Sequence, residues 1–267
     1  MTYIPELILL IAFLYALFVG YLYINQQKLT YYPNKNDYEP PPNAEIALVK
    51  TEDGLELEGW FFPPAQKGRS IILMFHGNAG HIVHRVYKVP QYYQAGYGVL
   101  LAEYRGYGKN PGSPHEEGLY KDARAYYQWL IDQGIKPENI IIHGESLGSA
   151  VATQLAYETP AKALILETPF SEFSDVALFH YPFIPFARYI TKEDFNSISK
   201  IQSIDIPKLL IVAGQDEVVG QQTGLKLYEA AYEPKKLVVL ENSRHSDHYN
   251  HDAGDAILSF LAKLSKK

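Results

Sequence analysis

The chain after about residue 44 alternates between short apolar runs and amphipathic stretches. Apolar residues recur at three- and four-residue intervals in the stretches, as on one face of a helix. The clearest stretch includes Leu119, Ala123, Tyr126, Leu130 and Ile131, and another begins near Asp252. The apolar runs are Ile71–Phe75, Tyr97–Tyr104, Ile140–Ile142, Lys162–Glu167, Lys208–Ala213 and Lys236–Glu241.

These runs predict an α/β fold. Strands that are apolar on both faces and separated by helices indicate a mostly parallel sheet covered on both sides. Two more strands are expected within "EIALVKTEDGLELEGWFF", joined at Asp53-Gly54, a dipeptide suited to a tight hairpin turn. The sequence therefore predicts an eight-stranded sheet that opens with an antiparallel hairpin.

The N-terminal segment has a different pattern. Leu7–Ile24 contains no charged residue, and its length suits a helix that crosses a hydrocarbon layer of about 30 Å. We interpret residues 1–27 as one transmembrane anchor, with a cleaved signal peptide or a helix packed on the domain as alternatives. Lys28 and Lys35 follow the run and no Lys or Arg precedes it, which favours a cytoplasmic position for the rest of the chain.

A proline-rich stretch, "PNKNDYEPPPN", follows the apolar segment. We expect residues 28–43 to form a semi-rigid linker and residues 44–267 to form the globular domain. Residues 169–204 interrupt the strand–helix alternation with many aromatic side chains. This segment is expected to be a cap over the carboxyl edge of the sheet, with Phe170, Phe173, Tyr181 and Phe183 in a substrate pocket, although the same aromatics could simply hold the cap on the domain.

Composition narrows the function. The 267 residues, 47% of them hydrophobic, suit one large domain, and the net charge of −6 argues against wrapping a nucleic acid. The chain has no cysteine, which excludes disulfides, thiolate catalysis and cysteine-ligated zinc.

The stretch "IIHGESLGSA" carries the clearest chemical signal. Gly144-x-Ser146-x-Gly148 follows an apolar run and precedes a run of small helix formers, the context of a nucleophile elbow. A serine nucleophile needs a histidine base and an acid, in the chain order Ser, Asp, His. Asp216 and His245 each follow a predicted strand and are therefore expected at the same sheet edge as Ser146.

Other residues compete for two of these roles. Glu217 adjoins Asp216, and His248 and His251 share a loop with His245. We favour His245 because it comes soonest after its strand. The three histidines could also bind a metal, but no carboxylate pair accompanies them, so no metal is expected.

The remaining candidates surround the serine. The backbone N–H groups of Asn78, after the run Ile71–Phe75, and of Leu147 are expected to form an oxyanion hole. His81 and His84 are expected to pack or to line the entrance of the site. His143 and His180 are expected to pack in the core or in the cap.

With these residues in place, the chain resembles the α/β-hydrolase superfamily, and within it the membrane-anchored bud-emergence-46-like branch. The matching motifs span nearly the whole chain: "QQKLTYYPN", "HGNAG", "YRGYGKNPGSPHEEGLYKDA", "HGESLG", "LETPF", "YPFIP", "DEVV" and "RHSD". The resemblance implies a triad at Ser146, Asp216 and His245, an oxyanion hole at Asn78 and Leu147, and hydrolysis of acyl esters or thioesters of lipids or acylated proteins.

The chain departs from the family pattern at four positions. Glu145 stands where arginine is usual, Ser149 where glycine is usual, and Ala213 and Gly220 where glycine and proline frame the acid loop. None removes a catalytic group, but Glu145 puts a carboxylate beside the nucleophile and questions the preference for substrate charge.

The sequence thus predicts a membrane-anchored serine hydrolase that uses no cofactor and acts on an acyl lipid or acylated substrate. A peptidase or amidase and an acyltransferase would use the same triad, and a non-catalytic membrane scaffold is the alternative of another class.

Overall fold

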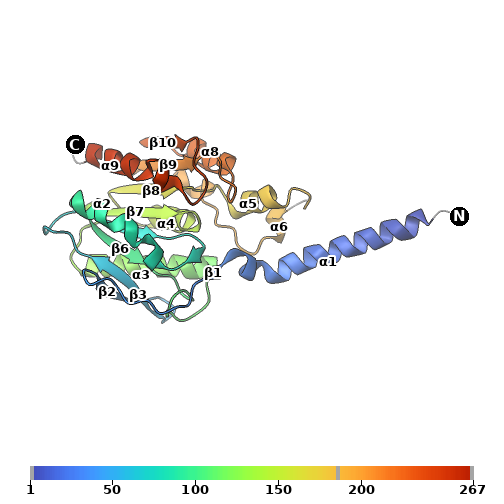
Figure 1. Ribbon diagram of the computed structural model, residues 1–267, viewed down its shortest axis with the longest axis horizontal. Coiled ribbons are helices and arrows are strands. Elements are labelled where there is room, and N and C mark those ends of the chain that lie inside the picture. Colours follow the sequence, from blue (N-terminus) through green and yellow to red (C-terminus); the bar gives the residue numbers. More distant parts are fainter. Residues whose placement is uncertain (1–2, 185–186, 265–267) are drawn as a thin grey trace.

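The computed structural model describes residues 3–184 and 187–264 (Figure 1). Its centre is an eight-stranded sheet in the order β10-β9-β8-β7-β4-β6-β3-β2. The strands run over β2 Glu45–Lys50, β3 Glu56–Phe62, β4 Ile71–Phe75, β6 Gly98–Ala102, β7 Ile140–Glu145, β8 Ala163–Glu167, β9 Lys208–Ala213 and β10 Lys235–Leu240.

The sheet is mostly parallel, as predicted. Within it, β3 pairs antiparallel with both β2 and β6, and the other neighbours pair in parallel. The β2–β3 turn contains Gly54 at φ 85°, a left-handed conformation that glycine adopts without strain. Because the six strands β4, β6, β7, β8, β9 and β10 run in one direction, their carboxyl ends meet at one edge, where the loops that follow them gather.

Helices cover both faces of the sheet and bury two apolar clusters. One face packs against α3, α4, α7 and α8, and the other against α2, α9 and the short 3-10 helix η1. The bounds are η1 Ile82–Lys88, α2 Val89–Gln94, α3 Glu116–Asp132, α4 Leu147–Glu158, α7 Ile198–Ile201, α8 Gln221–Ala230 and α9 Ala253–Leu264, with further 3-10 turns η2 Pro137–Asn139 and η3 His248–His251.

The N-terminal helix α1, Ile4–Thr30, projects from the domain (Figure 1). It is long and apolar enough to cross a membrane, with a mean hydropathy of 2.5 over its most apolar window, none of which is buried. The helix continues past the expected anchor boundary at residue 27. The division into anchor, linker and domain stays a prediction.

The segment after α1 lies against the domain rather than standing free as a spacer. Thr30 and Tyr31 are buried, and the two-residue strand β1, Tyr32–Pro33, pairs in parallel with β5, Ala79–Gly80. The start of the expected linker is thus fixed to the loop after β4, because its backbone groups find partners there.

The aromatic segment 169–204 contains no strand in its described part. It forms the helices α5, Phe173–His180, and α6, Ala187–Ile190, before α7. In Figure 1, α5 and α6 lie beside the domain-proximal half of α1. We call residues 173–184 and 187–190 the cap helices below.

Candidate active site at the carboxyl edge of the sheet

Ser146 lies in the turn between β7 and α4. Its backbone has φ 53° and ψ −119°, a strained conformation for a residue with a side chain. A Cβ at Gly144 would lie 2.1 Å from the carbonyl oxygen of Gly148, and one at Gly148 would lie 2.2 Å from that of Phe75. Both flanking glycines are therefore required by close backbone packing, which is the geometry expected of a nucleophile elbow.

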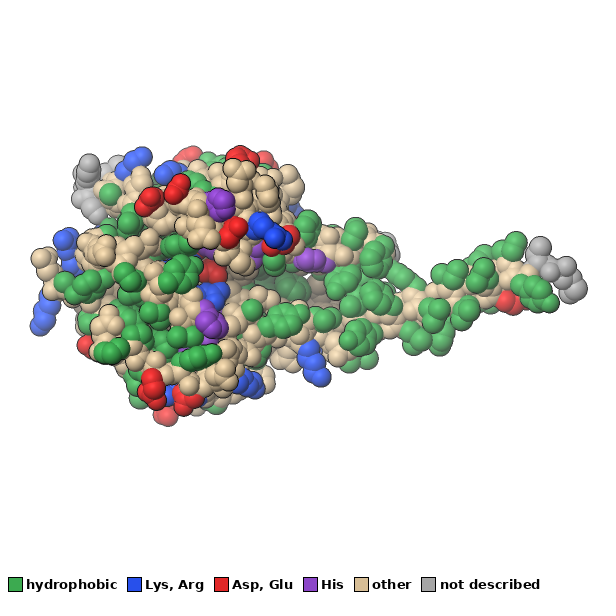
Figure 2. Space-filling view, viewed as in Figure 1, with side chains coloured by type: hydrophobic (Ala, Val, Ile, Leu, Met, Phe, Trp, Pro, Cys, Tyr) green, Lys and Arg blue, Asp and Glu red, His purple; other side chains and the backbone are tan. Residues whose placement is uncertain are grey.

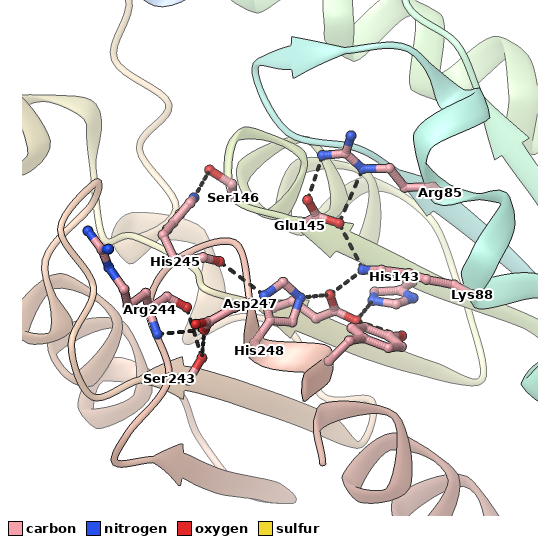
Figure 3. A network of polar contacts seen from close by, with 12 residues as sticks. Arg85, Lys88, His143, Glu145, Ser146, Ser243, Arg244, His245, Asp247 and His248 are labelled. Atoms are coloured by element: carbon pink, nitrogen blue, oxygen red, sulfur yellow. Dashed lines mark hydrogen bonds and ion pairs between the residues drawn. The ribbon is translucent and has the colours of Figure 1, made fainter. Parts of the chain in front are cut away.

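The structure brings Ser146, His245 and Asp216 together. Ser146 Oγ lies 2.9 Å from His245 Nε2, and His245 Nδ1 lies 2.8 Å from Asp216 Oδ2 (Figure 3 shows the Ser146–His245 pair). The Asp216 carboxylate also accepts the backbone N–H groups of Val218 and Val219, both at 2.9 Å. Each of the three side chains is thus held by hydrogen bonds in the order that proton transfer requires.

The environment keeps Asp216 ionised. Burial raises the pKa of this carboxyl, but the hydrogen bond and charge of His245 and the two backbone donors outweigh burial and lower the pKa below its ordinary value. A carboxylate at this position orients the imidazole with its proton on Nδ1 and leaves Nε2 free to accept the serine proton.

The competing residues lie elsewhere. Glu217 pairs with Arg244 at 3.2 Å and accepts the backbone N–H of His245 at 3.3 Å. His248 turns its Nε2 to Glu167 at 2.6 Å, and His251 lies 3.7 Å from Asp247. None of them takes the place of Asp216 or His245 beside Ser146.

Asn78 and Leu147 both line the cavity at Ser146. Leu147 is the first residue of α4, so its N–H has no partner within the helix. The side-chain amide of Asn78 donates to the carbonyl oxygen of Thr30 at 2.8 Å, and the backbone carbonyl oxygen of Asn78 accepts the N–H of Tyr32 at 2.9 Å. The expected oxyanion loop is therefore tied to the end of α1 and to β1.

An apolar cavity of about 380 Å³ lies above Ser146. None of its described lining residues is Asp, Glu, Lys or Arg. The lining comes from α1, the cap helices and the loops at the sheet edge: Leu22, Gln26, Leu29, Thr30, Tyr32, Asn78, Ser146, Leu147, Phe170, Phe173, Val176, Ala177, His180, Tyr181, Ile184, Ala187, Ile190, Thr191, Val218 and Val219.

Three of the four expected pocket aromatics line this cavity, namely Phe170, Phe173 and Tyr181. Phe183 differs. Its side chain is 56% exposed, and its ring lies 6.1 Å from that of Phe18 on α1. The chain turns after α5, so Phe183 lies on the side of the cap that faces α1 instead of the serine.

A buried polar network adjoins the elbow (Figure 3), and none of its charged residues lines the cavity. Lys88 is fully buried and lies 2.8 Å from Glu145 and 2.5 Å from Glu167, while Arg85 pairs with Glu145 at 2.6 Å. The two carboxylates have pKa values below the ordinary one: burial raises them, but the neighbouring cations, Lys88 foremost, outweigh that effect. The network is held ionised by alternating charges.

Histidines extend this network toward the triad. His143 and His248 each bond Glu167, at 2.8 and 2.6 Å, and His248 Nδ1 lies 3.0 Å from the backbone carbonyl oxygen of His245. Burial lowers the pKa of His248, but the Glu167 carboxylate raises it above its ordinary value overall. The loop that carries His245 is therefore fixed to the carboxylate at the end of β8.

Glu145 points away from the cavity. Because Arg85 and Lys88 neutralise it and it is absent from the cavity lining, the carboxylate beside the nucleophile does not face a substrate bound there. The question that Glu145 raised about substrate charge is answered by its orientation.

The other histidines fall into packing positions. His81 is buried against Trp60 and the Glu103 carboxylate, and His84 accepts the backbone N–H of His81 at the start of η1. His180 ends α5, and its Nε2 lies 2.7 Å from the carbonyl oxygen of Val218. It also lines the cavity, a position that its expected packing role did not include.

Glu145, Glu167 and His248 offer three potential metal ligands within 4.8 Å of one another. The ammonium of Lys88 already lies between the two carboxylates. It supplies the positive charge that a cation would bring, so this donor set does not suit a metal.

Sequence reasoning missed Lys88, Glu167 and the α1 wall of the cavity. Lys88 and Glu167 each lie within or at the end of an apolar stretch. That position was a usable signal, because a charged residue in a buried stretch is rarely found without an opposite charge beside it. Leu22 carried no signal of a cavity, because an apolar side chain within Leu7–Ile24 suits a membrane span equally well, and nothing in the local pattern marked Gln26 or Leu29.

These features define the class of protein. Residues 66–192 match the family described as "Serine aminopeptidase, S33". The fold matches that of an esterase from Pyrococcus furiosus, with a TM-score of 0.72 over 88% of this chain and 98% of that chain, at 19% identity. The chain is an α/β hydrolase.

Sequence relatives place it more narrowly. It is 31% identical to protein bem46 of Schizosaccharomyces pombe over 75% of this chain and 73% of that protein. It is 38% identical to lysophosphatidylserine lipase ABHD12 of Danio rerio over 67% of this chain and 51% of that protein. The chain belongs to the Bem46-like family of α/β hydrolases, as the resemblance implied.

Proposed function

We propose that this hydrolase cleaves acyl esters or thioesters of lipid-type substrates through a covalent acyl-enzyme on Ser146. The observation that carries the proposal is the hydrogen-bonded series from Ser146 through His245 to Asp216, which opens into an apolar cavity. An apolar cavity with a few polar groups at one end suits an acyl chain whose carbonyl reaches the serine.

The geometry supports a two-step acyl transfer. Ser146 Oγ attacks the acyl carbonyl carbon while its proton passes to His245 Nε2, and the Asn78 and Leu147 N–H groups stabilise the oxyanion. The protonated His245 then gives its proton to the leaving alkoxide or thiolate as the carbonyl re-forms. Water, deprotonated by His245, attacks the acyl-enzyme, and His245 returns the proton to Ser146 Oγ as the bond to the acyl carbon breaks and the acid leaves.

A lipid substrate is favoured by two observations. The cavity lining is apolar, and the relative from Danio rerio is named a lysophosphatidylserine lipase. The apolar helix α1 supports membrane anchoring, and Lys28 and Lys35 at its domain side favour a cytoplasmic catalytic domain.

The family description names a serine aminopeptidase. An aminopeptidase must bind the free ammonium of its substrate, and a carboxylate is the usual partner. No described residue that lines the cavity is Asp or Glu. We therefore favour ester over peptide cleavage, which a matched pair of ester and amide substrates would test directly.

The decisive experiment is labelling of the detergent-solubilised full chain with a fluorophosphonate probe. We expect labelling of the unsubstituted protein and none of Ser146→Ala, with ester turnover reduced about 10⁴-fold or more in Ser146→Ala and His245→Ala. Ser149→Ala is the matched control, because Ser149 is buried in the first turn of α4, three residues after Ser146, and its hydroxyl has no hydrogen-bond partner among the described residues. Equal labelling of folded Ser146→Ala would refute Ser146 as the nucleophile.

A further inference from the structure

The cap helices contact α1 inside its apolar run. The hydroxyl of Tyr15 donates to the carbonyl oxygen of Phe183 at 3.0 Å. The ring of Phe18 lies 6.5 Å from that of Tyr181 and 6.1 Å from that of Phe183. Tyr15 and Phe18 belong to the uncharged run Leu7–Ile24, so the cap reaches the middle of the segment expected to cross the membrane.

The position of Tyr15 and Phe18 along α1 determines the depth at which the cap would lie in a membrane. At 1.5 Å per residue, the eight residues between Glu6 and Tyr15 cover about 12 Å, less than half of a hydrocarbon core of about 30 Å. A spanning α1 must therefore keep Tyr15 and Phe18 within the hydrocarbon. Side chains that touch them, those of Tyr181 and Phe183, then lie at the same depth.

Polar contacts mark the level at which the membrane surface would lie. Gln26 donates to the carbonyl oxygen of Ile190 at 2.8 Å and accepts the backbone N–H of Lys192 at 2.8 Å. The ammonium of Lys192 lies 4.5 Å from the ring centre of Tyr23. Aromatic and cationic side chains gather at this level of membrane proteins, here at the end of the apolar run.

The cap helices also expose large apolar side chains. Leu178, Phe179 and Phe183 are exposed large hydrophobic side chains. Figure 2 shows hydrophobic side chains along α1 that continue onto the adjoining part of the domain. Clustered exposed apolar side chains need a covering partner, and their continuity with α1 indicates the same lipid layer.

We propose that the cap helices are inserted in the leaflet next to the domain and that an acyl lipid enters the cavity sideways from that leaflet, between α1 and the cap. Leu22 of α1 and Tyr181 of the cap both line the cavity, so its wall is shared by the two elements in contact with lipid. The acyl chain then passes from hydrocarbon to an apolar cavity without crossing water. The substrate part of this proposal rests on the proposed function, whereas the insertion of the cap does not.

The depth of the cap can be measured directly. Because the chain has no cysteine, each introduced cysteine is its sole thiol. Phe183→Cys and Leu178→Cys in the full chain are labelled with a nitroxide and reconstituted in phosphatidylcholine nanodiscs, and the label's accessibility to oxygen and to a water-soluble nickel chelate is measured. Phe13→Cys, in the apolar run, is the membrane reference, and Leu48→Cys, exposed on β2, is the aqueous reference.

We expect the labels at 183 and 178 to match the label at 13, with preferential access of oxygen. Labels at both cap positions that match the label at 48 would overturn the insertion of the cap, and so would a label at 13 that is itself open to the chelate. The accessibility measurement is repeated on Ser146→Ala, which has no nucleophile. Its result depends only on the depth of the cap, so failure of the cap insertion and failure of the proposed hydrolase activity are recognised separately.

The path of the lipid is tested in the same nanodiscs. A phosphatidylcholine with a photoactivatable group on its acyl chain is irradiated with full-chain Ser146→Ala, and the crosslinked peptides are mapped. Crosslinks to Leu22 and to cavity residues of α5 support sideways movement from the leaflet. Crosslinks confined to the outward face of α1, such as Phe13, would overturn it.

Discussion

The two regions that adjoin the nucleophile elbow differ in the charge of the side chains that form them. On one side, Lys88, Glu145 and Glu167 form a buried array of full charges in which each charge faces an opposite one. On the other side, the cavity above Ser146 is lined by apolar and uncharged side chains. The elbow is one turn of chain, and it adjoins both a network of paired charges and a cavity lined by uncharged side chains.

This difference shows how positioning and binding are divided. Buried charges with complete hydrogen-bond networks are rigid, because moving one leaves another unpaired in a low-dielectric interior. The network bonds His248 and through it the backbone of His245, so it fixes the base. The cavity has few polar groups in its lining, so it would make few directional bonds with the acyl chain of the proposed substrate.

Removing the central cation should have the largest effect on stability. Lys88→Met leaves two buried carboxylates without their shared partner, and breaking a buried pair in this way costs about 3–5 kcal/mol. We expect urea unfolding to show this loss. Lys109→Met is the matched control, because Lys109 is half-exposed, pairs with Glu58 at 3.1 Å and should cost at most about 1 kcal/mol. Equal losses in both variants would show that the network does not support the fold.

Filling the cavity should have the next largest effect, on selectivity. Leu22→Trp adds volume to the α1 wall, and an overpacked contact of about 1–3 kcal/mol corresponds to roughly a 5- to 150-fold loss for long acyl chains. Short-chain p-nitrophenyl esters should be hydrolysed as before. Tyr21→Trp, on the exposed side of the same helix, is the control. A uniform change across all chain lengths would place α1 outside the acyl-binding wall.

The smallest effect concerns pH. The pKa of His248 is higher in the folded protein than the ordinary value of 6.5, so protonation stabilises the fold. This contribution is complete below about pH 6.5 and is lost as pH rises through the folded-state pKa. We expect His248→Gln to lower the thermal midpoint more at pH 6 than at pH 9. His251→Gln, on the same turn but without a bond to Glu167, serves as the control, and a deficit that grows with pH would contradict the assignment.

Local patterns predicted most of the fold. The hairpin turn at Asp53-Gly54 and the helix around Leu119–Ile131 were predicted because turn geometry and helical spacing depend on neighbouring residues. Six strands followed from their apolar runs and two from the stretch around the hairpin turn. The order of the strands in the sheet did not, because it depends on contacts between residues far apart in the chain.

In the candidate site, too, some placements followed from the sequence and others did not. The sequence of Ser146, Asp216 and His245 predicted which side chains would meet, since each follows a strand whose end lies at one sheet edge. The prediction that Phe183 lines the pocket was wrong, because the direction of a side chain in an irregular cap depends on the helix that packs against it. Here that helix is α1, more than 150 positions earlier in the sequence.

By itself, the sequence determined the elements, the elbow and the chemistry available at the sheet edge, because steric limits and hydrophobic periodicity act over a few residues. Only the tertiary structure decided that Lys88 lies between Glu145 and Glu167 and that Leu22 forms a wall of the cavity. These placements follow from burying charge against charge and apolar surface against apolar surface. Such pairings join distant segments and leave no local pattern in the chain.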